Sequence, residues 1–114
     1  MLNQKIKDKI TKNSISLEGY GLNDLAWSKE NAKSLITEIM KDKIGILGGD
    51  VYRLTPKRLE PLSDNWSCEP QETESEEEYY SRSKSESLKY IENYPVEPEE
   101  KIIFSITFTE KIEQ

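Results

Sequence analysis

The chain has 114 residues, of which 33% are charged and 34% belong to the broad hydrophobic class. This length supports a single domain over residues 1–114 with one modest core, and it excludes two independent domains. Sixteen lysines and arginines stand against 22 aspartates and glutamates, a formal charge of −6, so we expect no direct binding to nucleic acid. Histidine is absent, which excludes catalytic triads and zinc sites that depend on imidazole.

The chain has one cysteine, Cys68, which cannot form an intrachain disulfide. A fold held together by packing alone is usual for reduced cytosolic proteins. The sequence contains neither the apolar core of a signal peptide nor a stretch approaching the ~18 apolar residues of a membrane span. We therefore expect a cytoplasmic protein that does not interact with a membrane.

Charge is distributed unevenly along the chain. Residues 1–58 have a balance of +4, and residues 59–114 have a balance of −10. Between Arg58 and Arg82, eight carboxylates occur without a lysine or arginine: Glu60, Asp64, Glu69, Glu72, Glu74, Glu76, Glu77 and Glu78. This run fits a solvated acidic loop that leads into a helix, or a surface that attracts a basic partner.

Two helices are predicted in the first half of the chain. Ser28 is a good N-cap for a helix over about 29–42, with Trp27 and Ala32 at the positions of a hydrophobic staple. Gly45 is placed to end this helix in the left-handed conformation. Apolar residues at four-residue spacing in the lysine-rich first stretch predict a short amphipathic helix: Leu2, Ile6 and Ile10.

The middle of the chain has the composition of strands and turns. Gly48 and Gly49 either form the turn between two strands or bend a single strand over 44–55. Residues 55–58 form a second predicted turn, after which a strand returns along the first. Pro61 places this returning strand at a sheet edge, and residues 65–69 suit a half-buried extended segment.

The sequence of the last third of the chain predicts one helix and one strand. Ser75 and Glu78 form a capping-box pattern for a helix that reaches about Asn93, although the polarity of residues 69–87 also suits partial flexibility. Alternating apolar residues over 102–108 predict a central antiparallel strand with one packed and one partly wet face. The fold class is therefore α+β: a small antiparallel sheet of three to five strands packed against two or three helices.

The chain shows no catalytic, metal-binding or cofactor-binding pattern. Its glycines lack the Lys-Ser/Thr ending of a phosphate-binding loop, and Asp50 and Asp64 do not occur in EF-hand spacing. Cys68 is interpreted as a buried structural thiol, since Glu69 and Glu72 beside it would raise its pKa. We therefore expect neither an enzyme nor a cofactor.

Aromatic residues flank the acidic run. Trp27 is predicted to be a core residue, and the core is also favoured for Trp66, although an interface role for Trp66 is retained because Trp and Tyr are common binding anchors. The candidate partner-binding residues are Trp66, Glu69, Glu72, Glu74, Glu76, Glu77, Glu78, Tyr79 and Tyr80.

Three short segments resemble a known family. They are Ile46-Leu47-Gly48-Gly49-Asp50-Val51-Tyr52, Asn65-Trp66-Ser67-Cys68 and Tyr90-Ile91-Glu92-Asn93-Tyr94. The chain is similar to the immunity protein 40 family of bacterial polymorphic-toxin systems, from about Gly21 to the last strand. We expect the acidic stretch over residues 69–87 to differ from the family pattern and to be particular to this sequence.

The resemblance implies a non-catalytic cytosolic protein that binds and neutralises a cognate toxin. An acidic inhibitor suits a basic toxin, because it would cover a phosphate-binding surface. Two alternatives stay open: a small ligand-binding module that uses Asp50 or the glutamates, and an acidic adaptor protein.

Overall fold

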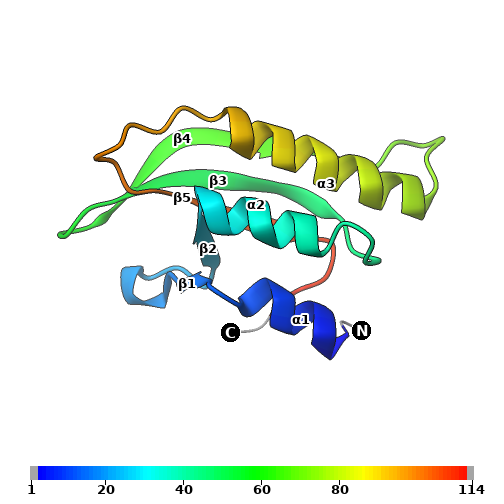
Figure 1. The fold of residues 1–114 in the computed structure, drawn as a ribbon, viewed down its shortest axis with the longest axis horizontal. Helices are drawn as coiled ribbons and strands as arrows, with labels where there is room; N and C mark the ends of the chain where they lie inside the picture. The colour runs from blue at the N-terminus through cyan, green and yellow to red at the C-terminus, as the bar shows by residue number, and fades with distance from the viewer. Residues whose placement is uncertain (1–2, 113–114) are drawn as a thin grey trace.

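The computed structural model describes residues 3–112, which contain three α-helices and a five-stranded antiparallel sheet (Figure 1). The strands lie side by side in the order β1-β2-β5-β3-β4. This confirms the predicted α+β class. The elements in chain order are α1 (Gln4–Thr11), β1 (Ile15–Ser16), the 3-10 helix η1 (Glu18–Tyr20), β2 (Leu25–Ser28), α2 (Lys29–Glu38), β3 (Ile46–Leu54), β4 (Leu59–Ser67), α3 (Glu76–Asn93) and β5 (Ile102–Phe108).

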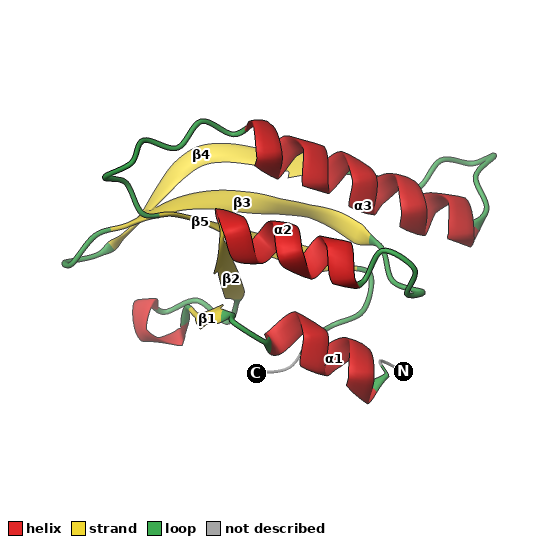
Figure 2. Ribbon diagram, viewed as in Figure 1, coloured by secondary structure: helices red, strands yellow, loops and turns green. Residues whose placement is uncertain are grey.

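The main core lies between the sheet and the helices. Helices α2 and α3 run along the same face of the sheet, and α1 packs below α2 (Figure 2). Trp27 and Phe104 are the largest apolar side chains at the centre, and both are at most 1% exposed. The indole Nε1 of Trp27 donates to the carbonyl of Ile10 at 3.1 Å, which fixes α1 against β2.

The central strand β5 is confirmed, but its second face is drier than predicted. Ile103 and Ser105 are buried, and Thr107 is exposed. Leu17 and Ala26 form a second small apolar cluster with Ile103 on this side of the sheet. The segment around η1 therefore covers part of the face that alternation predicted to be partly wet.

Helix α2 begins as predicted and ends earlier. The side chain of Ser28 accepts a hydrogen bond from the backbone of Asn31, as an N-cap should. The helix ends at Glu38 rather than near 42, and Gly45 does not have the positive φ that we predicted for it. The end is stabilised instead by Lys84, whose Nζ donates to the carbonyls of Ile39 at 2.9 Å and Asp42 at 2.6 Å.

Lys84 is fully buried on α3, and burial lowers the pKa of its ammonium. We expect Lys84→Met to lower the free energy of unfolding by about 2 kcal/mol, because two carbonyls at the end of α2 lose their donor inside the protein. Urea denaturation followed by circular dichroism measures the loss. Lys89→Met on the exposed side of the same helix is the matched control, and equal stability of the two variants would contradict the capping role.

Gly48 and Gly49 lie within one strand, so the single-strand interpretation is right and the two-strand interpretation is wrong. Gly48 has a φ of +153°, and a Cβ at either glycine would overlap a backbone carbonyl of a neighbouring strand. A Cβ at Gly49 would also overlap the indole ring of Trp66. The glycines thus allow β4 and its tryptophan to approach β3 closely.

The hairpin between β3 and β4 agrees with the sequence. Its turn is closed by the backbone of Thr55, which donates to the carbonyl of Arg58 at 2.9 Å. Pro61 lies on β4, which is an edge strand as predicted. Residues 65–67 continue this strand rather than forming a separate one.

Helix α3 has the predicted capping box and extends to Asn93, so residues 76–87 are helical. Near its start Tyr79 is buried, whereas Tyr80 and Leu88 are half-buried. The remaining buried positions are mostly polar: Ser83, Lys84, Ser87 and Ile91. Hydrogen bonds satisfy these polar groups, which allows a face with few apolar residues to be buried.

Candidate functional site

The acidic residues of the predicted site gather at one end of the molecule. We call Glu69, Glu72, Glu74, Glu76, Glu77 and Glu78 the acidic end. They lie in the loop after β4 and in the first turn of α3, which starts well beyond the end of β4 (Figure 1). All of them except Glu74 are exposed. Negative charge at a helix N-terminus is stabilised by the helix dipole, so the fold accepts this cluster at low cost.

Two carboxylates of the run have counter-ions that local sequence did not predict. Arg82 binds Glu74 with two guanidinium nitrogens, one of them at 2.9 Å, and binds Glu86 at 2.7 Å. Glu60 pairs with Arg53 and Arg58. These arginines lower the pKa of both Glu60 and Glu74. Arginines outside the acidic run therefore compensate Glu60 and Glu74, although no lysine or arginine lies between Arg58 and Arg82.

Five members of the acidic end have no ion pair within the described residues: Glu69, Glu72, Glu76, Glu77 and Glu78. Glu76 accepts a hydrogen bond from the hydroxyl of Tyr80 at 3.0 Å, and this bond is the main cause that raises the pKa of Tyr80. The side chain of Glu78 accepts from the backbone of Ser75, which lowers its pKa. The acidic end thus presents concentrated, largely uncompensated negative charge to solvent.

The aromatic residues among the predicted partner-binding residues are buried to different degrees. Tyr79 is 5% exposed, and its hydroxyl donates to the carbonyls of Cys68 at 2.7 Å and Ile46 at 3.2 Å. Trp66 is half-buried against the middle of α3, where its Nε1 donates to the hydroxyl of Ser87 at 2.9 Å. Ser87 lies eight residues along the helix from Tyr79, a rise of about 12 Å. The structure therefore groups the glutamates with Tyr80 and separates them from Trp66.

Cys68 is buried, as predicted. The pKa of its thiol is raised, but not by the glutamates that neighbour it in the sequence. Burial raises the pKa of its thiol, and Glu86 on α3 raises it further, whereas Glu69 and Glu72 do not contribute. We expect the thiol to react with a disulfide reagent much more slowly in the folded protein than in the urea-unfolded chain, because the thiolate is the nucleophile. Equal rates in the two states would contradict the burial of Cys68.

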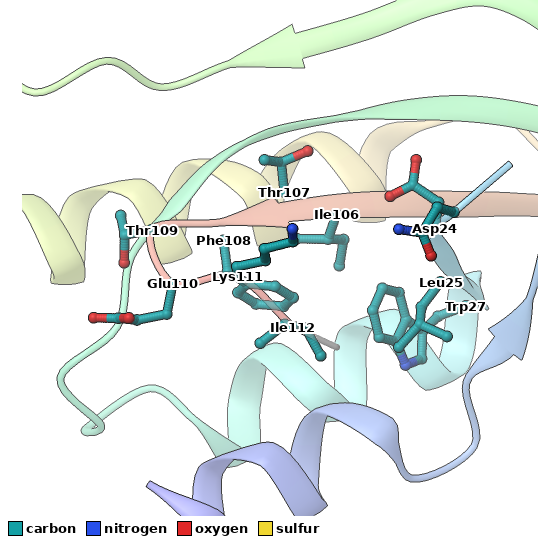
Figure 3. A pocket seen from close by; sticks show the side chains of 11 residues that line it. Asp24, Leu25, Trp27, Ile106, Thr107, Phe108, Thr109, Glu110, Lys111 and Ile112 are labelled. Atoms are coloured by element: carbon teal, nitrogen blue, oxygen red, sulfur yellow. The ribbon is translucent and has the colours of Figure 1, made fainter. Parts of the chain in front are cut away.

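A pocket of about 350 Å³ lies between the start of β2 and the residues at and after the end of β5 (Figure 3). Trp27 and Phe108 contribute aromatic rings whose centroids are 6.2 Å apart, and Asp24, Glu110 and Lys111 contribute charged groups. Burial and the nearby Asp50 raise the pKa of Asp24. The pocket therefore has a mixed apolar and charged lining, and its residues do not include a nucleophile paired with a base.

Two further properties of residues 3–112 bear on function. They contain no group of three or more histidine, cysteine, aspartate or glutamate side chains placed to hold a metal ion. None of their helices is both long enough and apolar enough to span a bilayer.

Comparison with known proteins identifies the family. The family model for immunity protein 40 matches residues 16–108, a range that runs from β1 to the end of β5. The chain belongs to the immunity protein 40 family, which confirms the resemblance in its sequence. Searches of curated proteins and of solved structures find no match. Immunity protein families are typically non-catalytic.

Proposed function

We propose that this protein binds a cognate bacterial toxin in the cytoplasm and neutralises it by covering its active surface, with no catalysis and no cofactor. The match to the immunity protein 40 family over residues 16–108 is the observation that carries the proposal. Stoichiometric occlusion requires a stable surface of sufficient area rather than a reactive group. A standard interface buries about 800 Å² on each partner, which one face of a domain of this size supplies.

The acidic end is the proposed contact surface, and a basic toxin is the proposed partner. Its exposed members are Glu69, Glu72, Glu76, Glu77 and Glu78, with Tyr80 beside them. Concentrated charge of one sign steers a partner of the other sign during encounter and sets its orientation. In this arrangement Tyr79 supports the surface from below through its two backbone hydrogen bonds.

Co-expression with the protein encoded immediately upstream tests the proposal. We expect that protein to stop growth when expressed alone, growth to recover when this chain is present, and the two to co-purify as a one-to-one complex. A harmless neighbour that forms no complex would contradict the proposal. It would favour the ligand-binding alternative, which predicts a higher melting temperature in the presence of a small molecule.

A further inference from the structure

An aromatic groove lies along the outer flank of the second half of α3. We call it the tyrosine groove; it is shallow and open to solvent, with a volume of about 600 Å³. Tyr90 and Tyr94 provide its aromatic surface, and both side chains are half-buried. The lining residues are Glu86, Lys89, Tyr90, Asn93, Tyr94 and Pro95.

The two rings are held rigidly from behind. Tyr90 stacks on Trp66 with centroids 4.7 Å apart and an interplanar angle of 28°, and Trp66 is fixed by its bond to Ser87. Tyr94 packs edge-on against the buried Phe104 at 5.6 Å. Aromatic side chains that are already ordered lose little conformational freedom when a partner binds. The groove is therefore a preorganised binding surface.

Carboxylates flank the groove at both ends. The hydroxyl of Tyr94 donates to the carboxylate of Asp64 on β4 at 2.6 Å, and burial, together with this contact, raises the pKa of Tyr94 to about 12. Glu86 lies one helical turn before Tyr90 and shares Arg82 with Glu74. Lys89 is the one cation in the lining, and it is exposed. Glu86 is thus ion-paired with Arg82, whereas Asp64 has no ion pair within residues 3–112 and accepts a bond only from a neutral hydroxyl.

The groove continues the surface of the acidic end. Glu78, Arg82, Glu86 and Tyr90 follow one another at four-residue spacing, so they lie on one face of α3. A partner drawn to the acidic end by its positive charge would reach the tyrosine groove along the same helix. Charge complementarity thus selects a basic partner for the groove as well.

We propose that the tyrosine groove receives an arginine side chain of the toxin, an inference that rests on the proposed function. The planar guanidinium stacks on the face of Tyr90 or Tyr94, and its N–H groups donate to Asp64 or Glu86. Arginine fits this site better than lysine, because its flat, weakly hydrated cation stacks on aromatic rings and donates in two directions. The groove then supplies a central anchor, while the acidic end supplies steering.

Binding of the purified, catalytically inactivated upstream toxin to three variants tests this inference. Tyr90→Leu removes the aromatic face but keeps an apolar side chain, and we expect it to weaken binding about tenfold. Tyr90→Phe retains the ring, and its affinity should stay within about twofold of wild type. Tyr20→Leu is the matched control, because Tyr20 is 45% exposed on η1, away from the groove.

Asp64→Asn provides a test that does not disturb the aromatic packing. The amide oxygen still accepts from Tyr94, so the fold is retained and only the charge is lost. We expect weaker binding by about threefold to tenfold. If wild type binds the toxin and both Tyr90→Leu and Asp64→Asn bind equally well, the groove is not the arginine site. If wild type itself does not bind, the proposed function fails instead.

Discussion

Gly49→Ala is expected to lower the free energy of unfolding by about 3 kcal/mol, a large loss for the addition of one methyl group. The new Cβ would overlap the backbone carbonyl oxygen of Ser105 on β5 and the indole ring of Trp66. Strand β3 pairs with β4 on one side and β5 on the other, so the backbone at this position cannot move away from both. Urea denaturation monitored by circular dichroism measures the loss.

Gly19→Ala is the matched control for this prediction. A Cβ at Gly19 on η1 would meet no atom within 4 Å, so this substitution should change stability by less than about 1 kcal/mol. If Gly49→Ala and Gly19→Ala have the same stability, the close approach of β3 to Trp66 is not what requires the glycine. The outcome also tests an explanation for the joint occurrence of the Gly-Gly-Asp and Asn-Trp-Ser segments in this chain. In this explanation, Gly49 is required because a side chain there would overlap the indole ring of Trp66.

Replacing Glu69, Glu72 and Glu77 with glutamine is expected to slow association with the toxin about tenfold at low ionic strength. These glutamates are exposed and have no ion pair within residues 3–112, so their loss weakens steering without breaking a contact in the fold. Glu78 is left in place because its side chain completes the capping box of α3. Stopped-flow measurements at several salt concentrations should show a lower rate and a weaker salt dependence than in wild type.

A second triple variant, which removes three carboxylates outside the acidic end, provides the control for net charge. Glu18, Glu97 and Glu99 lie in other parts of the chain and are also exposed, so their replacement by glutamine should affect the association rate far less. If both triple variants slow association equally, net charge rather than the acidic end accounts for steering. If neither has an effect, the toxin binds at another surface.

Much of the fold was predictable because its signals are local. The N-cap at Ser28, the capping box at Ser75 and the turn at 55–58 each depend on a few adjacent residues, and each occurs as predicted. The end of α2 was predicted wrongly because Lys84, 45 residues away, stabilises its carbonyls. The sequence left open whether Gly48 and Gly49 form a turn or lie within a strand. Only the structure shows that the neighbouring strands occupy the space that a Cβ would need at either glycine.

The candidate site was less predictable, since it depends on contacts across the fold. The sequence identified the acidic run, but not that Arg82 would bind Glu74, nor that Arg53 would bind Glu60 across the hairpin. Tyr79 and Tyr80 are adjacent, and only packing against β3 shows that Tyr79 is the buried member. The stacking of Trp66 on Tyr90 joins residues 24 positions apart, although the four-residue spacing of Tyr90 and Tyr94 was a visible sign of a shared face.

Neutralisation by stoichiometric binding can be tested by a titration of toxin activity. Purified upstream toxin is assayed at a fixed concentration while this protein is added in increasing amounts. We expect activity to fall linearly and to reach its minimum at one molecule of this protein per toxin. Full inhibition at a small fraction of one equivalent would indicate catalytic inactivation, and undiminished activity at excess would mean that the protein is not an inhibitor; either result would exclude neutralisation by stoichiometric binding.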